Sequence, residues 1–399
     1  MIIVANGLLI AFLALLTLPV TVLMLEVLCA FVPRRPAGMP DMGRPRVAVL
    51  VPAHNESAGI ASTLGSVGAQ LRKSDRMIVI ADNCSDDTAQ VAAACGAEVV
   101  ERNEPTVRGK GHALSRGVRY LEQGQPGDHP EVVVVIDADC SIADGVLDRI
   151  SRLTALTGRP VQCLYLMEAP DSAGPAGAIA EFAWIIKNKV RPLGAHNAGF
   201  PCQLMGTGMS LPWLAMRSLG LANGQIVEDL KMGLDLARAG LPALFSPETV
   251  VVSRFAGSVE GARMQRIRWE HGHLAMIFGE AASLFLEGIA KRRANLIMLA
   301  LDLSVPPLAL LAFLIATLVV LSALNALLGV SNVPFYGAGV LAAAFVVAIS
   351  LSWWRFARQT VRISSLPYLI AYFVGKLPIY FQFLVRRQKL WVRTKRDGD

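Results

Sequence analysis

The chain has 399 residues, which is long enough for a full α/β domain with a large core and for a further region. Hydrophobic residues make up 53% and charged residues 17%, and the mean hydropathy is +0.47, values that argue against a wholly soluble protein. The formal net charge is +7, but most of the excess Lys and Arg lies beside apolar segments and in the C-terminal tail. Anionic membrane lipids explain this charge better than nucleic acid, so we expect no nucleic-acid partner.

Residues 1–32 are predicted to form an N-terminal transmembrane anchor. No charged residue occurs from Ile3 to Leu25, a stretch long enough to span a bilayer. A cleaved signal peptide would have a basic start and a shorter apolar core, so we expect the anchor to be retained. Residues 33–45, rich in Pro, Arg and Gly, are the predicted linker to the next domain.

Residues 46–260 alternate strand and helix signals, as a doubly wound, mostly parallel α/β domain does. Buried strands are predicted at 47–51, 77–80 and 98–100, with a helix starting near Ser57 and a helix N-cap region at 85–88. Because ligands bind beyond the carboxyl ends of such strands, the polar residues that follow these three strands should lie where a nucleotide binds.

Between Val132 and Cys140 the chain reads VVVVIDADC, in which five aliphatic residues precede Asp137 and Asp139. The aliphatic run predicts a parallel strand that is buried on both faces and ends at the ligand-binding edge. Two carboxylates at that edge suit a hard divalent cation, Mg²⁺ or Mn²⁺, that holds a diphosphate. The alternative is a strand followed by an acidic turn.

The cysteines and histidines do not indicate a zinc site. His271 and His273 are close in sequence, but a His-x-His pair without a third ligand is a poor zinc site. The cysteines show no CxxC or other metal-type spacing, so we expect reduced thiols in a cytoplasmic domain. The six cysteines are Cys29, Cys84, Cys95, Cys140, Cys163 and Cys202.

The C-terminal part of the chain is predicted to contain further membrane segments. Residues 261–297 are basic and amphipathic at first and are predicted to be interfacial helices. No charge occurs from Leu303 to Trp354, which predicts two spans at 298–329 and 334–355. Residues 366–385 are long enough to span but contain Lys376 and two prolines, so an interfacial or re-entrant helix and a fourth span both remain open. Residues 386–399 are a basic tail.

The distribution of Lys and Arg predicts the orientation. Arg34 and Arg35 follow the first span, and Arg355 and Arg358 follow the predicted span at 334–355, whereas the turn between the two later spans is uncharged. By the positive-inside rule, the basic flanks face the cytoplasm. We therefore expect a multi-pass protein of the cell (inner) membrane with a cytoplasmic catalytic domain and a cytoplasmic C-terminus.

Six motifs follow one another along the chain: VPAHNE at 51–56, DNCSDDT at 82–88, RGKGHAL at 108–114, DAD at 137–139, Glu228-Asp229, and QRIRW at 265–269. In this order and approximate spacing they resemble the membrane-bound family 2 glycosyltransferases. These are enzymes of the cellulose, hyaluronan and chitin-oligosaccharide synthase type, and their catalytic domain has the GT-A fold. Any one motif alone is weak evidence for the family, but six motifs in the family's order, followed by membrane spans, are specific for it.

The resemblance implies a binding site for a nucleotide sugar. It implies that Asp82 hydrogen-bonds the base, since a carboxylate accepts from a uracil N–H. Asn83 departs from the family, which often has a second Asp here. Lys110, between two glycines, would reach the diphosphate; the alternative is a solvated turn lysine. The residues implied to line the uridine pocket are Pro52, Ala53, His54 and Glu56.

The resemblance also assigns the chemistry. Asp137 and Asp139 would bind the metal, with Asp139 as the more direct ligand. Glu228 and Asp229 form the catalytic carboxylate pair, and Asp229 would be the general base of a single displacement with inversion. The alternative for this pair is a favourable interaction with a helix N-terminus.

The QRIRW motif completes the implied site. Gln265 and Arg268 would contact the donor, with Arg268 paired to the diphosphate, and Trp269 would stack on the acceptor sugar. The alternative for the charges of this stretch is a surface-lying helix anchored by its arginines. A small-residue turn that adjoins the acceptor is implied at Gly206, Thr207 and Gly208.

These observations predict a membrane-bound, metal-dependent glycosyltransferase that moves a sugar from a UDP-sugar to a growing β-linked polysaccharide or oligosaccharide. The alternative acceptor is a lipid, as in ceramide glucosyltransferases. The chain has less material for its own translocation pore than the larger synthases, which favours the lipid acceptor or requires self-assembly or a partner subunit. A non-catalytic nucleotide sensor would not need Asp229 and Trp269 beside an intact DAD.

Overall fold

A computed structural model describes residues 2–33, 43–125, 127–222, 227–365 and 367–385. The described chain forms two compact units. We call them the helical unit, residues 2–33, 171–200 and 269–385, and the sheet unit, residues 43–170 and 201–268. Residues 171–200 belong to the helical unit, although the predicted domain at 46–260 includes them.

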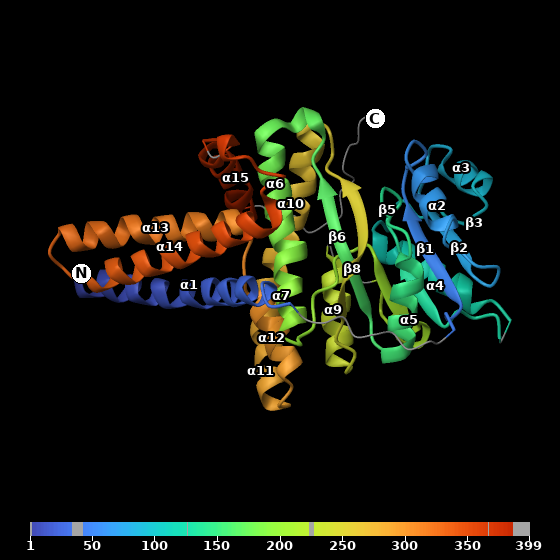
Figure 1. Cartoon of the computed structure of the whole chain (residues 1–399), viewed down its shortest axis with the longest axis horizontal. Helices are drawn as coiled ribbons and strands as arrows, with labels where there is room; N and C mark the ends of the chain where they lie inside the picture. Colours follow the sequence, from blue (N-terminus) through green and yellow to red (C-terminus); the bar gives the residue numbers. More distant parts are fainter. Residues whose placement is uncertain (1, 34–42, 126, 223–226, 366, 386–399) are drawn as a thin grey trace. The chain divides into compact units, whose positions relative to one another are not determined.

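The sheet unit contains an eight-stranded mixed sheet with strand order β3-β2-β1-β4-β7-β6-β8-β5 (Figure 1). Neighbours pair in parallel from β3 to β4 and between β6 and β8, whereas β7 runs antiparallel to both of its neighbours and β5 antiparallel to β8. This confirms the predicted α/β class with a mostly parallel sheet. The strands are β1 (Val47–Ala53), β2 (Arg76–Asp82), β3 (Glu98–Arg102), β4 (Val132–Val135), β5 (Ser141–Ile142), β6 (Val161–Glu168), β7 (Met209–Pro212) and β8 (Leu244–Arg254).

The aliphatic strands lie in the core as predicted. Every residue of β4 is buried, and so is β1 apart from Pro52. The first helix starts later than expected, at Ile60 instead of near Ser57, because residues 57–59 form a turn in which Gly59 N–H donates to Glu56 O (3.0 Å). This first helix is α2 (Ile60–Gly68), and it is followed in this unit by α3 (Thr88–Ala94), α4 (Lys110–Glu122), α5 (Val146–Thr157), α8 (Trp213–Arg217) and α9 (Glu228–Arg238).

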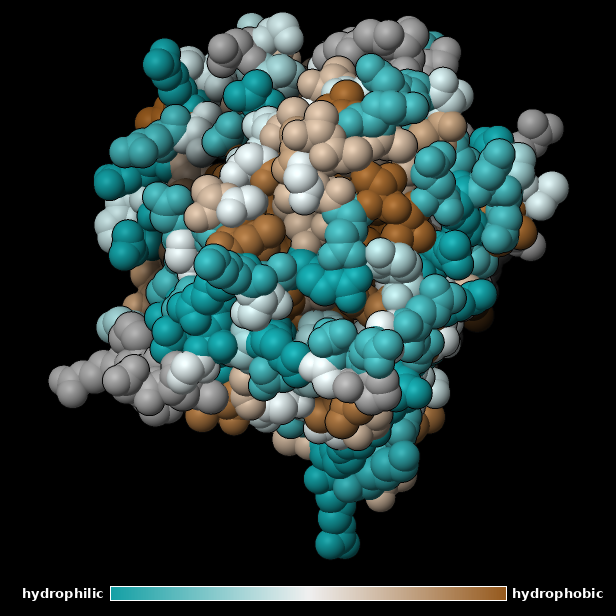
Figure 2. All heavy atoms as spheres, turned by 90° about the vertical axis from the view of Figure 1, so that its right-hand side faces the viewer, coloured by the Kyte–Doolittle hydropathy of each residue, from teal (hydrophilic) through white to brown (hydrophobic). Residues whose placement is uncertain are grey.

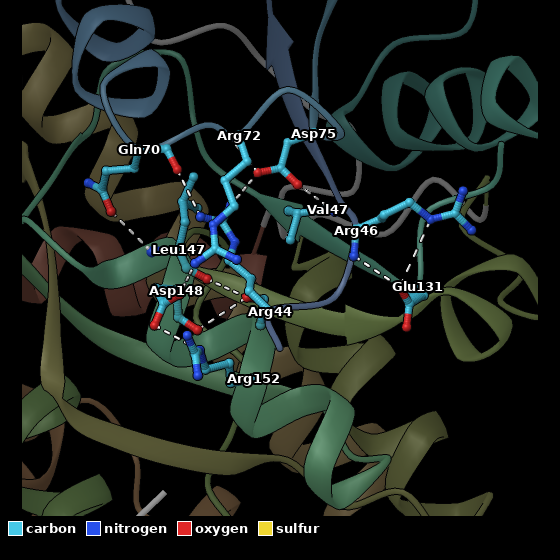
Figure 3. Close-up of polar contacts among 11 residues, drawn as sticks. Arg44, Arg46, Val47, Gln70, Arg72, Asp75, Glu131, Leu147, Asp148 and Arg152 are labelled. Atoms are coloured by element: carbon cyan, nitrogen blue, oxygen red, sulfur yellow. Dashed lines mark hydrogen bonds and ion pairs between the residues drawn. The ribbon is translucent and has the colours of Figure 1, made fainter. Parts of the chain in front are cut away.

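Near the start of β1, Arg44 joins the chain to the turn before β2 (Figure 3). Its guanidinium donates to Asp75 Oδ2 (2.6 Å) and to Gln70 O (2.8 Å), and only 3% of its side chain is exposed. Asp75 Oδ1 also accepts from Val47 N–H (3.0 Å), the first residue of β1. Arg44, one of the arginines that follow the first span, is therefore a structural residue.

On the β1–β3 side of this unit, hydrophilic residues cover much of the surface (Figure 2).

The helical unit consists of helices, several of them long and apolar. Helices α1, α13 and α14 lie side by side (Figure 1). Helix α10 begins in the sheet unit and continues past residue 268 into this one. The helices are α1 (Ile2–Ala30), α6 (Gly174–Ile185), α7 (Arg191–Asn197), α10 (Val259–Met276), α11 (Ala282–Ala290), α12 (Ala294–Leu303), α13 (Leu308–Leu327), α14 (Val333–Ser352) and α15 (Tyr368–Val385), with π-helical turns η2 (Ile186–Val190), η3 (Ile277–Ala281) and η4 (Trp353–Ala357) and 3₁₀ turns η1 (Asp171–Ala173) and η5 (Ile363–Ser365).

Among the described residues, five helical segments are long and apolar enough to cross a membrane. Large apolar side chains on these helices are exposed, for example Leu15 (69%), Leu327 (83%) and Val340 (72%), as expected for surfaces that face lipid. The five segments are Val4–Ala30, Glu260–Ala290, Leu308–Leu327, Val333–Ala357 and Tyr368–Val385.

These segments differ from the predicted ones in two respects. The span expected at 298–329 begins later, since α12 ends at Leu303 and the apolar helix α13 begins at Leu308. Pro306 and Pro307 lack the N–H groups that a continuous helix needs. Glu260–Ala290, expected to be interfacial, is also apolar and long enough to span. An interfacial position for it stays a prediction.

Candidate active site

The carboxyl ends of β1, β2 and β3 meet at one edge of the sheet, as predicted. His54 follows β1, and its Nδ1 donates to the backbone oxygen of Asp82 at the end of β2 (2.6 Å). Asp82 is in turn the register partner of Arg102, the last residue of β3. The turn after β1 is fixed as well, because Glu56 N–H donates to Thr88 Oγ1 (2.8 Å). The structure thus places His54 and Asp82 in contact at this edge, and their role in a nucleotide pocket stays a prediction.

Asp82 is buried at this edge, with 7% of its surface exposed. Its Oδ1 accepts from Arg102 Nη1 (2.5 Å) and from Asn83 Nδ2 (2.9 Å). Burial raises the pKa of the Asp82 carboxyl above its ordinary value, and the Arg102 guanidinium acts in the opposite direction. Arg102 was not identified from the sequence.

Lys110 is the first residue of α4, and it is not a solvated turn lysine. Its Nζ pairs with Asp137 Oδ1 and donates to Gly206 O (2.8 Å), and 17% of its side chain is exposed. Burial disfavours the charged form of Lys110, but the carboxylates of Asp137, Glu228 and Asp229 outweigh it and raise its pKa. Gly111 is required here, because a Cβ on it would lie 2.3 Å from Leu221 O.

The DAD turn follows β4 directly. Asp137 N–H donates to Thr207 Oγ1 (3.0 Å), which connects this turn to the 206–208 segment. Asp139 Oδ2 accepts from Ser253 Oγ (3.2 Å) at the end of β8, and Oδ1 accepts from Cys140 Sγ (3.4 Å). These contacts fix the backbone of Asp137 and orient the carboxylate of Asp139, while the carboxylate of Asp137 pairs with Lys110.

The DAD turn can serve a hard divalent cation. Within the described parts of the chain, no group of three or more His, Cys, Asp or Glu side chains could hold a metal. Two carboxylates nevertheless fit Mg²⁺ or Mn²⁺, because such ions often take one or two protein carboxylates and complete their shell with phosphate and water. Asp137 and Asp139 are the residues that would hold it.

Glu228 and Asp229 form the first turn of α9. Burial, and then the charge of Asp229, raise the pKa of Glu228 to about 7, whereas Lys110 and Arg268 act to lower it. A Cβ on Gly206, whose φ is +93°, would lie 3.3 Å from Asp229 Oδ2 and 3.8 Å from Lys110 Nζ. The absence of this Cβ therefore leaves room beside the carboxylate of Asp229 and the amine of Lys110.

The QRIRW motif lies on α10, with Gln265, Arg268 and Trp269 at the i, i+3 and i+4 positions of one helix face. Gln265 is 8% exposed, and its buried Oε1 has no hydrogen-bond partner among the described residues. Trp269 belongs to the helical unit, where its ring packs against Trp184 with centroids 4.8 Å apart. Its contact with an acceptor sugar stays a prediction.

Sequence comparison identifies the family. A sequence profile described as "Glycosyltransferase like family 2" matches residues 45–272, more than half of the chain. The chain belongs to this family. Uncharacterized glycosyltransferases of Mycobacterium bovis and Mycobacterium tuberculosis are each 36% identical to this glycosyltransferase over 228 residues, which cover 54% of its chain and 92% of theirs. It is thus an enzyme that transfers a sugar from a nucleotide-sugar donor.

Structural comparison supports the fold of this glycosyltransferase. It resembles the mannosyltransferase PcManGT from Pyrobaculum calidifontis, solved in complex with GDP-Man and Mn²⁺, with a TM-score of 0.54 and 19% identity. The match covers 88% of this chain and 99% of PcManGT. At this identity the likeness shows a shared GT-A fold.

Sequence reasoning missed several residues of the site. Arg102 had only one signal, a basic residue at the end of the short predicted strand EVVER. Ser253 had none, because it meets Asp139 from 114 positions away in the sequence. Both residues orient carboxylates that the sequence did indicate.

Proposed function

We propose that this glycosyltransferase is membrane-bound and inverting, and that it transfers a sugar from a UDP-sugar to a growing β-linked polysaccharide or oligosaccharide. The observation that carries the proposal is the convergence of Lys110, Asp137 and Gly206 beside the Glu228-Asp229 pair. Displacement of a nucleoside diphosphate needs charge neutralisation on the leaving group and a base for the attacking hydroxyl. This cluster supplies residue types for both.

Lys110 and Arg268 supply positive charge for the diphosphate, Lys110 from the start of α4 and Arg268 from α10. Asp229 takes the proton of the acceptor hydroxyl as the sugar is transferred. A single displacement by that hydroxyl inverts the anomeric carbon. Uracil lies at Asp82, in the pocket formed by Pro52, Ala53, His54 and Glu56.

A divalent cation held by Asp137 and Asp139 would neutralise charge on the departing diphosphate. We expect EDTA to abolish transfer and Mn²⁺ or Mg²⁺ to restore it. Asp139→Asn should be inactive at any metal concentration, because one of only two carboxylate ligands is lost. Full activity in excess EDTA would contradict the assignment. Exposed Asp144→Asn, in the segment between β5 and α5, is the matched control.

The same machinery with a lipid acceptor is the second candidate. Among the described residues, the five apolar segments offer limited material for a private translocation pore. A lipid acceptor would need no such pore, whereas a polymer would call for self-assembly or a partner subunit. The deciding experiment incubates the purified enzyme with a panel of radiolabelled UDP-sugars and separates organic-soluble from polymeric product. A single sugar on a lipid at every substrate ratio would replace the polysaccharide proposal.

We place the catalytic domain in the cytoplasm, at the inner membrane. The support is the distribution of Lys and Arg, with Arg34 and Arg35 after the first apolar segment and Arg355 and Arg358 near the end of α14. Reporter fusions should place residue 200 inside and residue 330 outside. The reverse result would invert the topology without affecting the chemistry.

A further inference from the structure

The two oxygens of Asp82 have different surroundings. Oδ1 accepts two hydrogen bonds, from Arg102 Nη1 (2.5 Å) and Asn83 Nδ2 (2.9 Å). No described residue hydrogen-bonds Oδ2. One oxygen of this carboxylate is thus already in use by the protein, and the other is available for a ligand at the carboxyl edge of the sheet.

Arg102 is held firmly in this position. It is 7% exposed, and its Nη2 donates to Glu104 Oε2 (3.0 Å) and to Val107 O (2.8 Å) while Nη1 reaches Asp82. A guanidinium fork shared among three acceptors cannot turn toward Oδ2 without losing several of these contacts.

The amide of Asn83 is oriented by the backbone. Its Oδ1 accepts from Glu104 N–H (2.7 Å), so the other end of the amide must be the NH₂ group that donates to Asp82. The residue has φ +53°, a left-handed conformation that Asn tolerates, and its own N–H donates to Arg102 O (2.7 Å). An Asp here could not donate to Asp82, which gives this departure from the family pattern a physical reason.

Nucleobases differ in how many donors they present to such a carboxylate. Uracil offers a single imide N–H flanked by two carbonyl oxygens, whereas guanine offers an N–H and an NH₂ side by side. Guanine would need both carboxylate oxygens, and its NH₂ would meet the N–H donors of Arg102 and Asn83. Uracil needs only Oδ2, and the carbonyl beside its N–H would face those donors.

We propose that Arg102 and Asn83 select the base of the donor nucleotide by occupying Oδ1 of Asp82, which favours uracil over guanine. This deepens the proposed function and rests on its placement of the donor base at Asp82. Arg102 and Asn83 are specificity-determining residues in this proposal, and neither takes part in the transfer step.

The test compares the affinities of the full-length enzyme for UDP and GDP by calorimetry. The wild type should bind UDP at least about tenfold more tightly than GDP, since a site built for one hydrogen-bonding pattern rejects another. Asn83→Asp keeps the shape of the side chain and the oxygen that accepts from Glu104 N–H. It replaces the NH₂ group that donates to Asp82 with a carboxylate oxygen, which repels Asp82. We expect UDP affinity to fall about tenfold or more and the preference over GDP to shrink. Arg102→Lys keeps the charge without the fork and should reduce the same preference.

Asn55→Asp is the matched control. Asn55 also has a left-handed φ (+52°), and its amide bonds Ser85 instead of Asp82, so the ratio of UDP to GDP affinity should not change. Equal affinities in the wild type, or an unchanged ratio in Asn83→Asp with an unchanged thermal unfolding midpoint, would overturn the proposal. If UDP is preferred through Asn83 but no UDP-sugar supports transfer, the base selection stands and the proposed function fails. Transfer from a GDP-sugar, with GDP the tighter ligand, overturns the selection and leaves the glycosyltransferase activity intact.

Discussion

The ion pairs of the helical unit differ from the cluster of carboxylates at the candidate site of the sheet unit. In the helical unit, buried charges form pairs of opposite sign that join different helices. Arg191 Nε of α7 lies 2.6 Å from Glu26 Oε2 of α1, and Arg191 Nη2 lies 2.5 Å from Asp302 Oδ1 of α12. Lys376 of α15 lies 2.5 Å from Glu270 Oε1 of α10. Each pair therefore connects segments that are distant in the sequence and fixes how they pack.

In the sheet unit, by contrast, like charges are brought together. Glu228 and Asp229 are adjacent at the start of α9, and Asp137 is paired with Lys110 close to them. Crowded carboxylates have altered protonation and are typical of sites where a ligand supplies further countercharge. The buried ion pairs of the helical unit serve packing, as Arg44–Asp75 does in the sheet unit, whereas the carboxylate cluster around Glu228 and Asp229 suits chemistry. Substitutions can test this difference.

The largest expected effect is on the stability of the helical unit. Arg191→Met should lower the free energy of unfolding by about 3–5 kcal/mol, because it leaves two carboxylates unpaired in a buried setting. The contact is tight, since a Cβ on Gly194, one turn further along α7, would lie 1.9 Å from Glu26 O. Thermal and denaturant unfolding of the detergent-solubilised protein would measure the loss.

Lys291→Met is the control for Arg191→Met, because Lys291 is 56% exposed and its pair with Glu287 joins neighbouring turns of one helix. It should cost less than about 1 kcal/mol. The triple variant that also carries Glu26→Gln and Asp302→Asn should recover part of the loss. Equal unfolding of Arg191→Met and Lys291→Met would show that the buried cluster does not organise the unit.

The second effect is on chemistry in the sheet unit. Asp229→Asn removes the proposed base with little change in shape, so transfer should fall by at least about a hundredfold, equivalent to about 2.7 kcal/mol of barrier. UDP affinity should stay within a few-fold of the wild type, and stability should change little. Steady-state transfer and UDP titration would measure the two quantities.

Asp144→Asn, an exposed carboxylate of the same unit, should leave both quantities unchanged. A wild-type rate in Asp229→Asn would rule out its role as base. An equal loss of UDP affinity and transfer would make Asp229 a nucleotide ligand or a structural residue.

The strands of the sheet could be predicted from the sequence more completely than the buried ion pairs of the helical unit. Continuous aliphatic runs located β1 and β4, because a strand buried on both faces has a local signature. Lys376 was recognised as an obstacle to a membrane span at 366–385, but its partner was not, since Glu270 lies 106 residues away. Lys376 Nζ pairs with Glu270 and lies 4.9 Å from the centre of the Tyr372 ring, so its charge is sheltered inside the unit. This removes one argument against a span at Tyr368–Val385.

The candidate site was predictable to a similar extent. Motifs gave the residues that would touch the ligand, such as Asp82, which ends β2, and Lys110, which opens α4. The residues that orient them, Arg102 and Ser253, depend on tertiary register and could not be derived from local pattern. Asn83 was visible as a departure from the family, but its role as a donor to Asp82 required the fixed amide orientation.

The smallest expected effect is a pH dependence that belongs to the crowded carboxylates. Burial, and then the charge of Asp229, raise the pKa of Glu228 from 4.5 to about 7. Between pH 4.5 and about 7 the Glu228 carboxyl is therefore protonated in the native state and ionised in the unfolded chain. The resulting stability is complete below the unfolded pKa and is lost as pH rises through about 7. Between about pH 5 and 8 the wild type should therefore lose about 1–2 kcal/mol more than Glu228→Gln. Exposed Glu101→Gln should keep the wild-type slope, and equal slopes in wild type and Glu228→Gln would mean that Glu228 ionises as an ordinary surface carboxylate.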